Sequence, residues 1–222
     1  MSYFVKNLAI LTEEEQRLLS EKRILVAGCG GLGGSVIELL CRSGFMHLTV
    51  VDGDVFEPSN MNRQILCTTE TLGQSKALTA AKRARLISPE IEIEPVADFI
   101  TEENIRGLIR GKDLVMDALD SVEGRLMLED ACAAEGVWLV HGAVKDWMLQ
   151  TAVCPPGAGV LHRLYGSGGS GGNPGGVGVN VFSCASFEVT EAIKLMTGRE
   201  GSLSGKILFF DLYEKESQIV EL

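Results

Sequence analysis

A glycine-rich turn constrains this chain more than any other feature of its sequence. Gly28, Gly30, Gly31 and Gly33 follow a continuous apolar run, 24–27, and precede a stretch, 34–42, with apolar residues at helical spacing. Such a run is typical of a strand buried on both faces. Glycines at this spacing allow a tight turn and let N–H groups at the helix N-terminus approach a phosphate. The turn therefore predicts a phosphate-binding strand–turn–helix unit, although close packing alone is an alternative use for its glycines.

Alternation of strands and helices continues beyond this turn. Apolar runs are followed by helical patterns, and parallel strands joined in this way have right-handed crossovers. The expected strands are 24–27, 48–51, 91–96, 114–116 and 137–140, and the expected helices include 34–42, 76–87 and 124–135. The chain is therefore predicted to be an α/β protein with a Rossmann-like, doubly wound and mostly parallel sheet.

The pattern changes in the C-terminal part of the chain. A strand over 149–153, a long helix over 181–196 and antiparallel edge strands over 207–210 and 217–220 are expected there. Residues 154–179 are expected to form a glycine-rich crossover loop. At the other end, residues 1–22 are expected to form an arm with a short helix capped by Thr12 and Glu15. Because no repeat or linker interrupts the chain, we expect one domain over 1–222.

Charge and cysteine usage exclude several classes of protein. The 222 residues carry a net charge of −10, which weighs against a broad nucleic-acid or anionic-membrane surface. The six cysteines form no Cys-x-x-Cys pair and are expected to be reduced thiols. No segment approaches the about 18 apolar residues of a membrane span, and the N-terminus lacks a signal-peptide core. A cytoplasmic protein is therefore expected.

Two polar segments indicate which kind of nucleotide the turn binds. Asp52 ends the second expected strand, where a carboxylate can bind a ribose hydroxyl of either a dinucleotide or ATP. Asp54 and the cluster Ser59-Asn60-Met61-Asn62-Arg63-Gln64 follow, and Lys76 begins the next helix. An arginine fork and a second cation match the oxygens of a triphosphate, whereas hydride transfer has no evident use for them. The cluster therefore favours ATP over a nicotinamide or flavin dinucleotide.

Five ordered motifs together resemble the ThiF/MoeB/HesA family, whose members are bacterial relatives of the ubiquitin-activating enzymes. They are Val26–Gly33, Asp52–Asp54, Ser59–Gln64, Gly73–Lys76 and Asp117–Ser121. The resemblance extends from about residue 3 to residue 198. It implies an adenylyltransferase that uses ATP and Mg²⁺ to activate the C-terminal Gly-Gly of a ubiquitin-like sulfur carrier of ThiS or MoaD type. Thiamine and molybdopterin biosynthesis are the pathways that such carriers serve.

The resemblance also implies roles for individual residues. Asp52 would hold the ribose, and Asn60, Arg63 and Lys76 would surround the triphosphate. Asp120 would bind Mg²⁺, although an acid beside Ser121 can instead serve as a helix N-cap. The remaining nucleotide contacts are expected from Asp54, Ser59, Asn62 and Ser121.

Three segments depart from the family pattern. In family dimers an N-terminal arginine enters the partner's ATP site, and Lys6 has the matching position here. The resemblance therefore implies a homodimer in which Lys6 supplies charge without the guanidinium fork. The zinc-binding cysteine pairs of many members are reduced to Cys154, so no zinc is expected. The crossover loop lacks a cysteine, and Cys29 and Cys184 are expected to be packing residues.

Other functions remain open at this level. The carboxylate could belong to a small acid, a peptide or a modified tRNA, and a non-catalytic nucleotide-binding regulator would carry the same turn. A dinucleotide-dependent oxidoreductase is the least favoured alternative. His141 is expected just after a strand, where it could point into the active-site cleft; a structural role is favoured.

Overall fold

The computed structural model describes residues 3–166 and 176–222. It contains one eight-stranded sheet with the order β3-β2-β1-β4-β5-β6-β7-β8, in which the first five strands are parallel and the last three pair in antiparallel fashion. The strands are β1 (Arg23–Ala27), β2 (His47–Val51), β3 (Glu92–Val96), β4 (Leu114–Asp117), β5 (Trp138–Lys145), β6 (Met148–Cys154), β7 (Lys206–Asp211) and β8 (Glu216–Glu221). The predicted α/β fold, with its antiparallel C-terminal strands, is confirmed.

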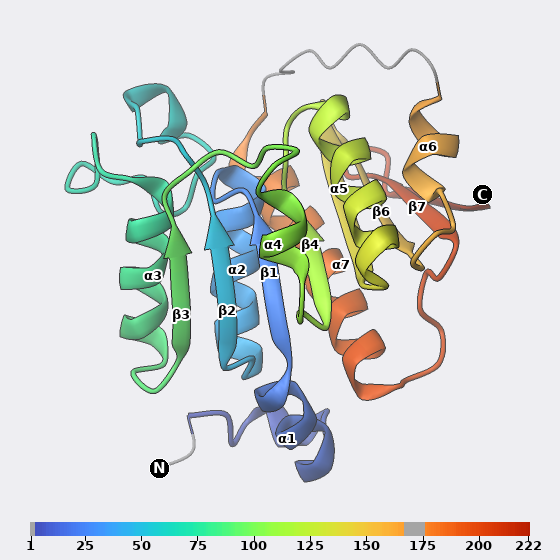
Figure 1. Ribbon diagram of the computed structural model, residues 1–222, viewed down its shortest axis with the longest axis horizontal. Helices are drawn as coiled ribbons and strands as arrows, with labels where there is room; N and C mark the ends of the chain where they lie inside the picture. Colours follow the sequence, from blue (N-terminus) through green and yellow to red (C-terminus); the bar gives the residue numbers. More distant parts are fainter. Residues whose placement is uncertain (1–2, 167–175) are drawn as a thin grey trace.

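Helices cover both faces of the sheet (Figure 1). They are α1 (Glu13–Glu21), α2 (Gly31–Ser43), α3 (Lys76–Ile87), α4 (Ile105–Ile109), α5 (Val122–Glu135), α6 (Val160–Tyr165) and α7 (Gly178–Thr197), with the 3₁₀ turns η1 (Asn7–Ala9) and η2 (Pro58–Asn60). Apolar residues of α2, α3 and α7 share one core cluster, and those of α4, α5 and α6 share another. The sheet is therefore enclosed between two helical layers.

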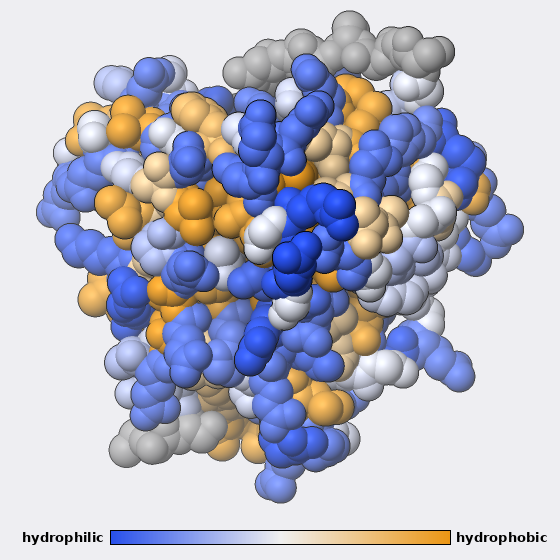
Figure 2. Space-filling model, in the orientation of Figure 1, coloured by the Kyte–Doolittle hydropathy of each residue, from blue (hydrophilic) through white to orange (hydrophobic). Residues whose placement is uncertain are grey.

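Strand β1 shows why a continuous apolar run encodes a central parallel strand. Ile24 and Val26 pack into the cluster with α2 and α7, whereas Leu25 and Ala27 pack into the opposite cluster. Alternate side chains thus meet different helical layers, and both layers are apolar. The space-filling view in Figure 2 shows hydrophilic residues interspersed with apolar ones on one face of the molecule.

Two elements differ from the sequence prediction. Part of the segment expected as a crossover loop, 154–179, is helical, because α6 occupies 160–165 and α7 begins at Gly178; residues 167–175 lie outside the described part of the chain. Strand β5 extends to Lys145, so that His141 lies within it rather than after it. A Cβ at residue 142 would lie 1.3 Å from Oε1 of Glu188 on α7. Gly142 therefore makes room for that carboxyl group within a regular strand.

Among residues 3–166 and 176–222, no helix is long and apolar enough to cross a membrane.

A buried carboxylate joins the two helices that follow the first two strands. Glu38 of α2 accepts hydrogen bonds from Arg42, one turn later, and from Arg83 of α3, at distances of 2.6–2.9 Å. Burial by itself would raise the pKa of Glu38, but the bonds from Arg83 and Arg42 outweigh it and lower the pKa below 4.5. Because its pKa is lower in the folded state, Glu38 stabilises the fold above about pH 4.5 and loses this effect as the pH falls.

Replacing this carboxylate should therefore cost stability in a pH-dependent way. We expect Glu38→Gln to lower the free energy of unfolding by about 1 kcal/mol at pH 7, a modest value because both arginines are half exposed. The difference from wild type should shrink below pH 4.5 in urea titrations followed by circular dichroism. Glu90→Gln, which changes an exposed acid, is the control. A difference that stayed constant with pH would contradict the assigned ion pairs.

Candidate active site

A polar pocket lies at the carboxyl ends of the parallel strands, beside the point where the chain crosses from β3 back to β4. Ligands of open α/β sheets bind at such a switch point, because the loops from β1 and β4 diverge there. Its lining comes from the ends of the strands, from helices α3, α5 and α7, and from β5. The contributing loops are the turn after β1, the segments before and after η2, and the loops after β3 and β4. Residues predicted from sequence that line it are Gly28, Gly30, Gly31, Asp52, Asp54, Arg63, Lys76 and Asp120.

The glycines of the turn divide into two kinds. Gly30 and Gly31 line the pocket, and Gly30 is the N-cap of α2 without a side-chain cap. The first N–H groups of this helix therefore have no helical acceptor and carry the positive end of the helix dipole. Gly33 does not line the pocket in the described part of the chain; a Cβ there would lie 1.9 Å from the Gly28 carbonyl oxygen. Its place is in the packing of α2 on β1.

Asp52 ties the turn to the end of β2. Its Oδ2 accepts a 2.7 Å hydrogen bond from the Cys29 N–H, and its Oδ1 accepts one of 2.9 Å from the Asp54 N–H. Both oxygens are held by main chain while the carboxylate stays partly exposed at the pocket edge. The remaining lone pairs can accept bonds from a ribose hydroxyl.

Two cations point toward the same space. Lys76 is only 7% exposed, and its Nζ lies 3.0 Å from Oδ2 of Asp54. The Arg63 guanidinium donates to the Ser59 carbonyl and to Oδ1 of Asn62, both at 3.0 Å. With the open N-terminus of α2, these side chains give the pocket three groups that stabilise anionic oxygens.

Asp120 is the free carboxylate of the pocket. It is exposed in the loop between β4 and α5 and has no hydrogen bond or ion pair to any residue of 3–166 or 176–222. The helix N-cap is Ser121, whose Oγ accepts from the Gly124 N–H at 3.1 Å, so the alternative role for Asp120 is wrong. The described residues contain no cluster of three metal-ligating side chains. A single carboxylate suits Mg²⁺, which takes most of its ligands from phosphates and water.

Four residues predicted for the nucleotide site do not line the pocket formed by the described residues. Ser59, Asn60, Asn62 and Ser121 are absent from the pocket lining given by the described residues. Asn60 is buried and its Oδ1 accepts from the Glu57 N–H, whereas Asn62 donates to the Gly176 carbonyl. Short polar side chains cap backbone groups as readily as they bind ligands, and sequence does not separate these uses.

Lys6 lies far from the pocket of its own chain. The neighbouring Asn7 donates to the Arg42 carbonyl in the last turn of α2, at 3.2 Å. The 13 residues of α2 separate this end from the pocket, about 20 Å at a rise of 1.5 Å per residue. Lys6 is therefore out of reach of the pocket of its own chain.

The sequence analysis assigned no role to several pocket residues, among them Gln64, Arg125 and Phe99. Gln64 is 6% exposed, and its Oε1 has no partner among the described residues. Its signal was its position directly after Arg63 in the polar cluster. Arg125, on α5, and Phe99, whose ring would be 2.7 Å from a Cβ at Gly53, also line the pocket. Neither carries a local pattern that distinguishes it from a surface residue.

The two thiols considered in the sequence analysis are packed away from solvent. Cys29 and Cys184 are both buried, and this burial raises the pKa of each thiol well above its usual value. Sγ of Cys184 lies 3.5 Å from the Gln150 carbonyl oxygen. A buried, protonated thiol is a poor nucleophile, which agrees with packing roles for both cysteines.

Comparisons with known proteins give a consistent result. A family model described as the ThiF family matches residues 4–222. The SAMP-activating enzyme E1 of Haloferax volcanii is 34% identical over 94% of this chain and 79% of its own length. The sulfur carrier protein ThiS adenylyltransferase of Bacillus subtilis is 34% identical over 90% of this chain and 61% of its own length. The crystal structure of E. coli tRNA N6-threonylcarbamoyladenosine dehydratase, TcdA, has a TM-score of 0.76 at 26% identity and covers 88% of this chain and 94% of that chain.

Proposed function

This chain belongs to the ThiF family, and on that premise we propose that it is an ATP-dependent adenylyltransferase. Its substrate is the C-terminal glycine carboxylate of a ubiquitin-like sulfur-carrier protein. The observation that carries this proposal is the convergence of Arg63, Lys76 and Asp120 on the open N-terminus of α2. Relatives named as activators of SAMP and of ThiS support the choice of a protein carrier.

The proposed reaction is a displacement at the α-phosphorus of ATP. A carboxylate oxygen of the carrier forms the new O–P bond, and the bond from the α-phosphorus to the bridging oxygen breaks. Pyrophosphate leaves with that electron pair, and the acyl-adenylate remains. Little covalent chemistry is needed from the protein, so its task is to align the reactants and stabilise developing charge.

Residues of this chain fit these tasks. Backbone N–H groups at Gly30 and Gly31 orient the phosphates, Asp52 holds the ribose, and Arg63 and Lys76 neutralise the leaving pyrophosphate. Asp120 would hold Mg²⁺, which supplies further neutralisation of phosphate charge when bound. Asp54 keeps Lys76 in place through the 3.0 Å ion pair.

The proposal extends to assembly and metals. We propose a homodimer, because the resemblance matches Lys6 to a residue that enters the partner's ATP site and Lys6 lies too far from its own pocket to act there. No structural zinc is proposed, since Cys154 is a buried residue of β6 in the sheet core. Sedimentation and elemental analysis of the purified protein test these two points; a monomer, or one zinc per chain, would contradict them. A cytoplasmic location goes with the reduced thiols that the proposal assumes.

Exchange of labelled pyrophosphate into ATP tests the proposed activity. We expect exchange only when a carrier ending in Gly-Gly is added, and none with the same carrier lacking its last glycine. Exchange with small acids in the absence of a carrier would move the substrate to that class. ATP binding without exchange for any substrate would overturn the enzymatic assignment and leave a nucleotide-binding regulator.

A carboxylate on modified tRNA is a second candidate substrate. The TcdA structure matches this chain over 94% of its own length, and a threonyl group bears a carboxylate. The net charge of −10 weighs against a tRNA surface. The same exchange assay with total tRNA separates the two substrates, because only one of them should stimulate it.

Removal of the buried cation gives a direct test of the pocket. We expect Lys76→Ala to lower the rate of pyrophosphate exchange by about 10²-fold, since it removes one preorganised electrostatic contact to the phosphates. The control is Lys82→Ala, which removes an exposed lysine from the same helix. Equal rates for the two variants would exclude Lys76 from the site.

A further inference from the structure

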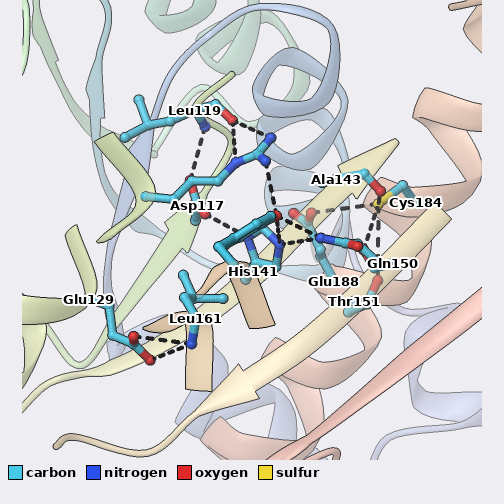
Figure 3. Close-up of polar contacts among 12 residues, drawn as sticks. Asp117, Leu119, Glu129, His141, Ala143, Gln150, Thr151, Leu161, Cys184 and Glu188 are labelled. Carbon is cyan, nitrogen blue, oxygen red and sulfur yellow. Dashed lines mark hydrogen bonds and ion pairs between the residues drawn. The ribbon is translucent and has the colours of Figure 1, made fainter. Parts of the chain in front are cut away.

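A buried acid and a buried imidazole lie directly beneath the pocket and have no part in the chemistry proposed above. Asp117 ends β4, and His141 is its neighbour in β5 by strand register. Both side chains are fully buried, and Nδ1 of His141 lies 2.6 Å from Oδ2 of Asp117 (Figure 3). Ionisable groups in the core need hydrogen-bond partners, because burial of unpaired charge is costly.

The pair forms part of a closed ring of hydrogen bonds. From Nε2 of His141 the ring passes to the Tyr165 hydroxyl at 3.0 Å and then to the Arg125 guanidinium at 2.9 Å. Arg125 donates through Nε and a terminal nitrogen to the Leu119 carbonyl, at 3.0 and 2.9 Å. The Leu119 N–H returns to Oδ1 of Asp117 at 3.0 Å. The N–H and the carbonyl oxygen of Leu119 are therefore both held by hydrogen bonds of this ring.

The donors and acceptors of the ring determine which nitrogen of His141 carries the proton. A carboxylate only accepts, so Nδ1 of His141 donates to Asp117 and Nε2 keeps a lone pair for the Tyr165 O–H. The Tyr165 oxygen then accepts from Arg125 and, at 2.6 Å, from Gln150. Burial lowers the pKa of His141 more than the bond to Asp117 raises it, in agreement with a neutral ring. The Gln150 amide also lies 3.0 Å from Nε2 of His141 and shares that lone pair with the Tyr165 hydroxyl. The bonds of the ring itself are compatible with one another in this state.

Leu119 directly precedes Asp120, so the ring holds the peptide groups next to the Asp120 side chain. We propose that His141 is a positioning residue that, through Asp117, Tyr165 and Arg125, fixes the loop from which Asp120 faces the pocket. The inference rests on the proposed function, in which Asp120 holds Mg²⁺. Asp120 itself has no hydrogen bond or ion pair among the described residues that would orient it, so its direction depends on the peptide groups before it.

The test measures how much Mg²⁺ strengthens ATP binding. Calorimetric titrations of ATP in EDTA and in Mg²⁺ give this increment for wild type, Tyr165→Phe and His141→Ala. Tyr165→Phe breaks the ring while keeping the side-chain volume, which guards against simple failure to fold. We expect both variants to bind ATP normally in EDTA but to lose about fivefold of the Mg²⁺ increment, as expected for a misplaced ligand. The double variant should lose no more than either single one, because the ring acts as a unit.

A matched control separates positioning from stability. Glu191 is a buried carboxylate on α7 whose oxygens accept from Lys194 and from the Leu203 N–H at 2.7 Å, with no hydrogen bond to the ring or to the Asp120 loop. Glu191→Gln should lower Tm yet keep the full Mg²⁺ increment. If the ring variants lowered Tm but kept the full Mg²⁺ increment of ATP binding, the inference would be overturned and the proposed function would stand. A wild-type protein without ATP binding, or with an increment that Asp120→Asn leaves unchanged, would overturn the proposed site together with the inference.

Discussion

Replacing Asp120 by Asn should reduce pyrophosphate exchange by about 10²–10³-fold or more. Asparagine keeps the size of the side chain but removes the negative charge and the hard oxygen pair that suit Mg²⁺. Because the Asp120 side chain is exposed and has no partner within 3–166 or 176–222, the fold should not depend on it. We therefore expect the free energy of unfolding to change by no more than about 0.5 kcal/mol.

Glu123→Gln provides the matched control for this experiment. Glu123 is an exposed acid three residues further along the chain, in the first turn of α5 and outside the pocket lining. Pyrophosphate exchange by this variant should equal that of wild type. That result would show that loss of one surface charge does not by itself reduce exchange. Normal exchange by Asp120→Asn would remove Asp120 from the active site.

Gly33→Ala should have the largest effect on the fold. The added Cβ would lie 1.9 Å from the Gly28 carbonyl oxygen and 3.2 Å from Cβ of Ala118. Because the closest atom belongs to the backbone, the turn must move, and we expect a loss of about 3 kcal/mol or more. For a chain of this size that corresponds to a fall in Tm of roughly 6–12 °C. ATP affinity should fall as well, because the N–H groups of α2 move with the turn.

Gly107→Ala separates this clash from a general effect of changing glycine to alanine. Gly107 lies within α4, and a Cβ there would meet no atom within 4 Å. Alanine favours helix over glycine by up to about 1 kcal/mol, so this variant should match or exceed wild type in Tm. An unchanged Tm for Gly33→Ala would contradict the close approach of α2 to β1.

Much of the fold was predictable because its signals are local. Each parallel strand is a short apolar run, and caps such as Thr12 with Glu15 and Gly198 mark helix ends. Helix α6 was missed because its six residues lie in a segment rich in glycine and proline. The length of β5 was missed because only the tertiary structure shows that Gly142 accommodates Glu188 from a helix more than 40 residues later.

The residues of the site were predicted only in part from the sequence. The glycines at 28, 30 and 31, together with Asp52, Arg63, Lys76 and Asp120, were expected from motifs and do line one pocket. The same motifs also contain Asn60 and Ser121, which cap backbone groups instead. A motif records which residues occur together along the chain, and it does not distinguish a ligand from the residue that supports the ligand's loop.

The amino-acid sequence by itself determined the parallel α/β architecture, the phosphate-binding turn and the family, because these depend on periodicity, glycine spacing and ordered motifs. Only the tertiary structure decided which polar side chains face the pocket and which support it. Asp117, Arg125, His141 and Tyr165 belong to four different elements. Asp117 is part of the motif Asp117–Ser121, but no local pattern links it to the other three residues. Their ring exists because strand register sets His141 beside Asp117 and because α5 and α6 pack on the same face of the sheet. Such contacts are properties of packing between distant segments, which no local pattern encodes.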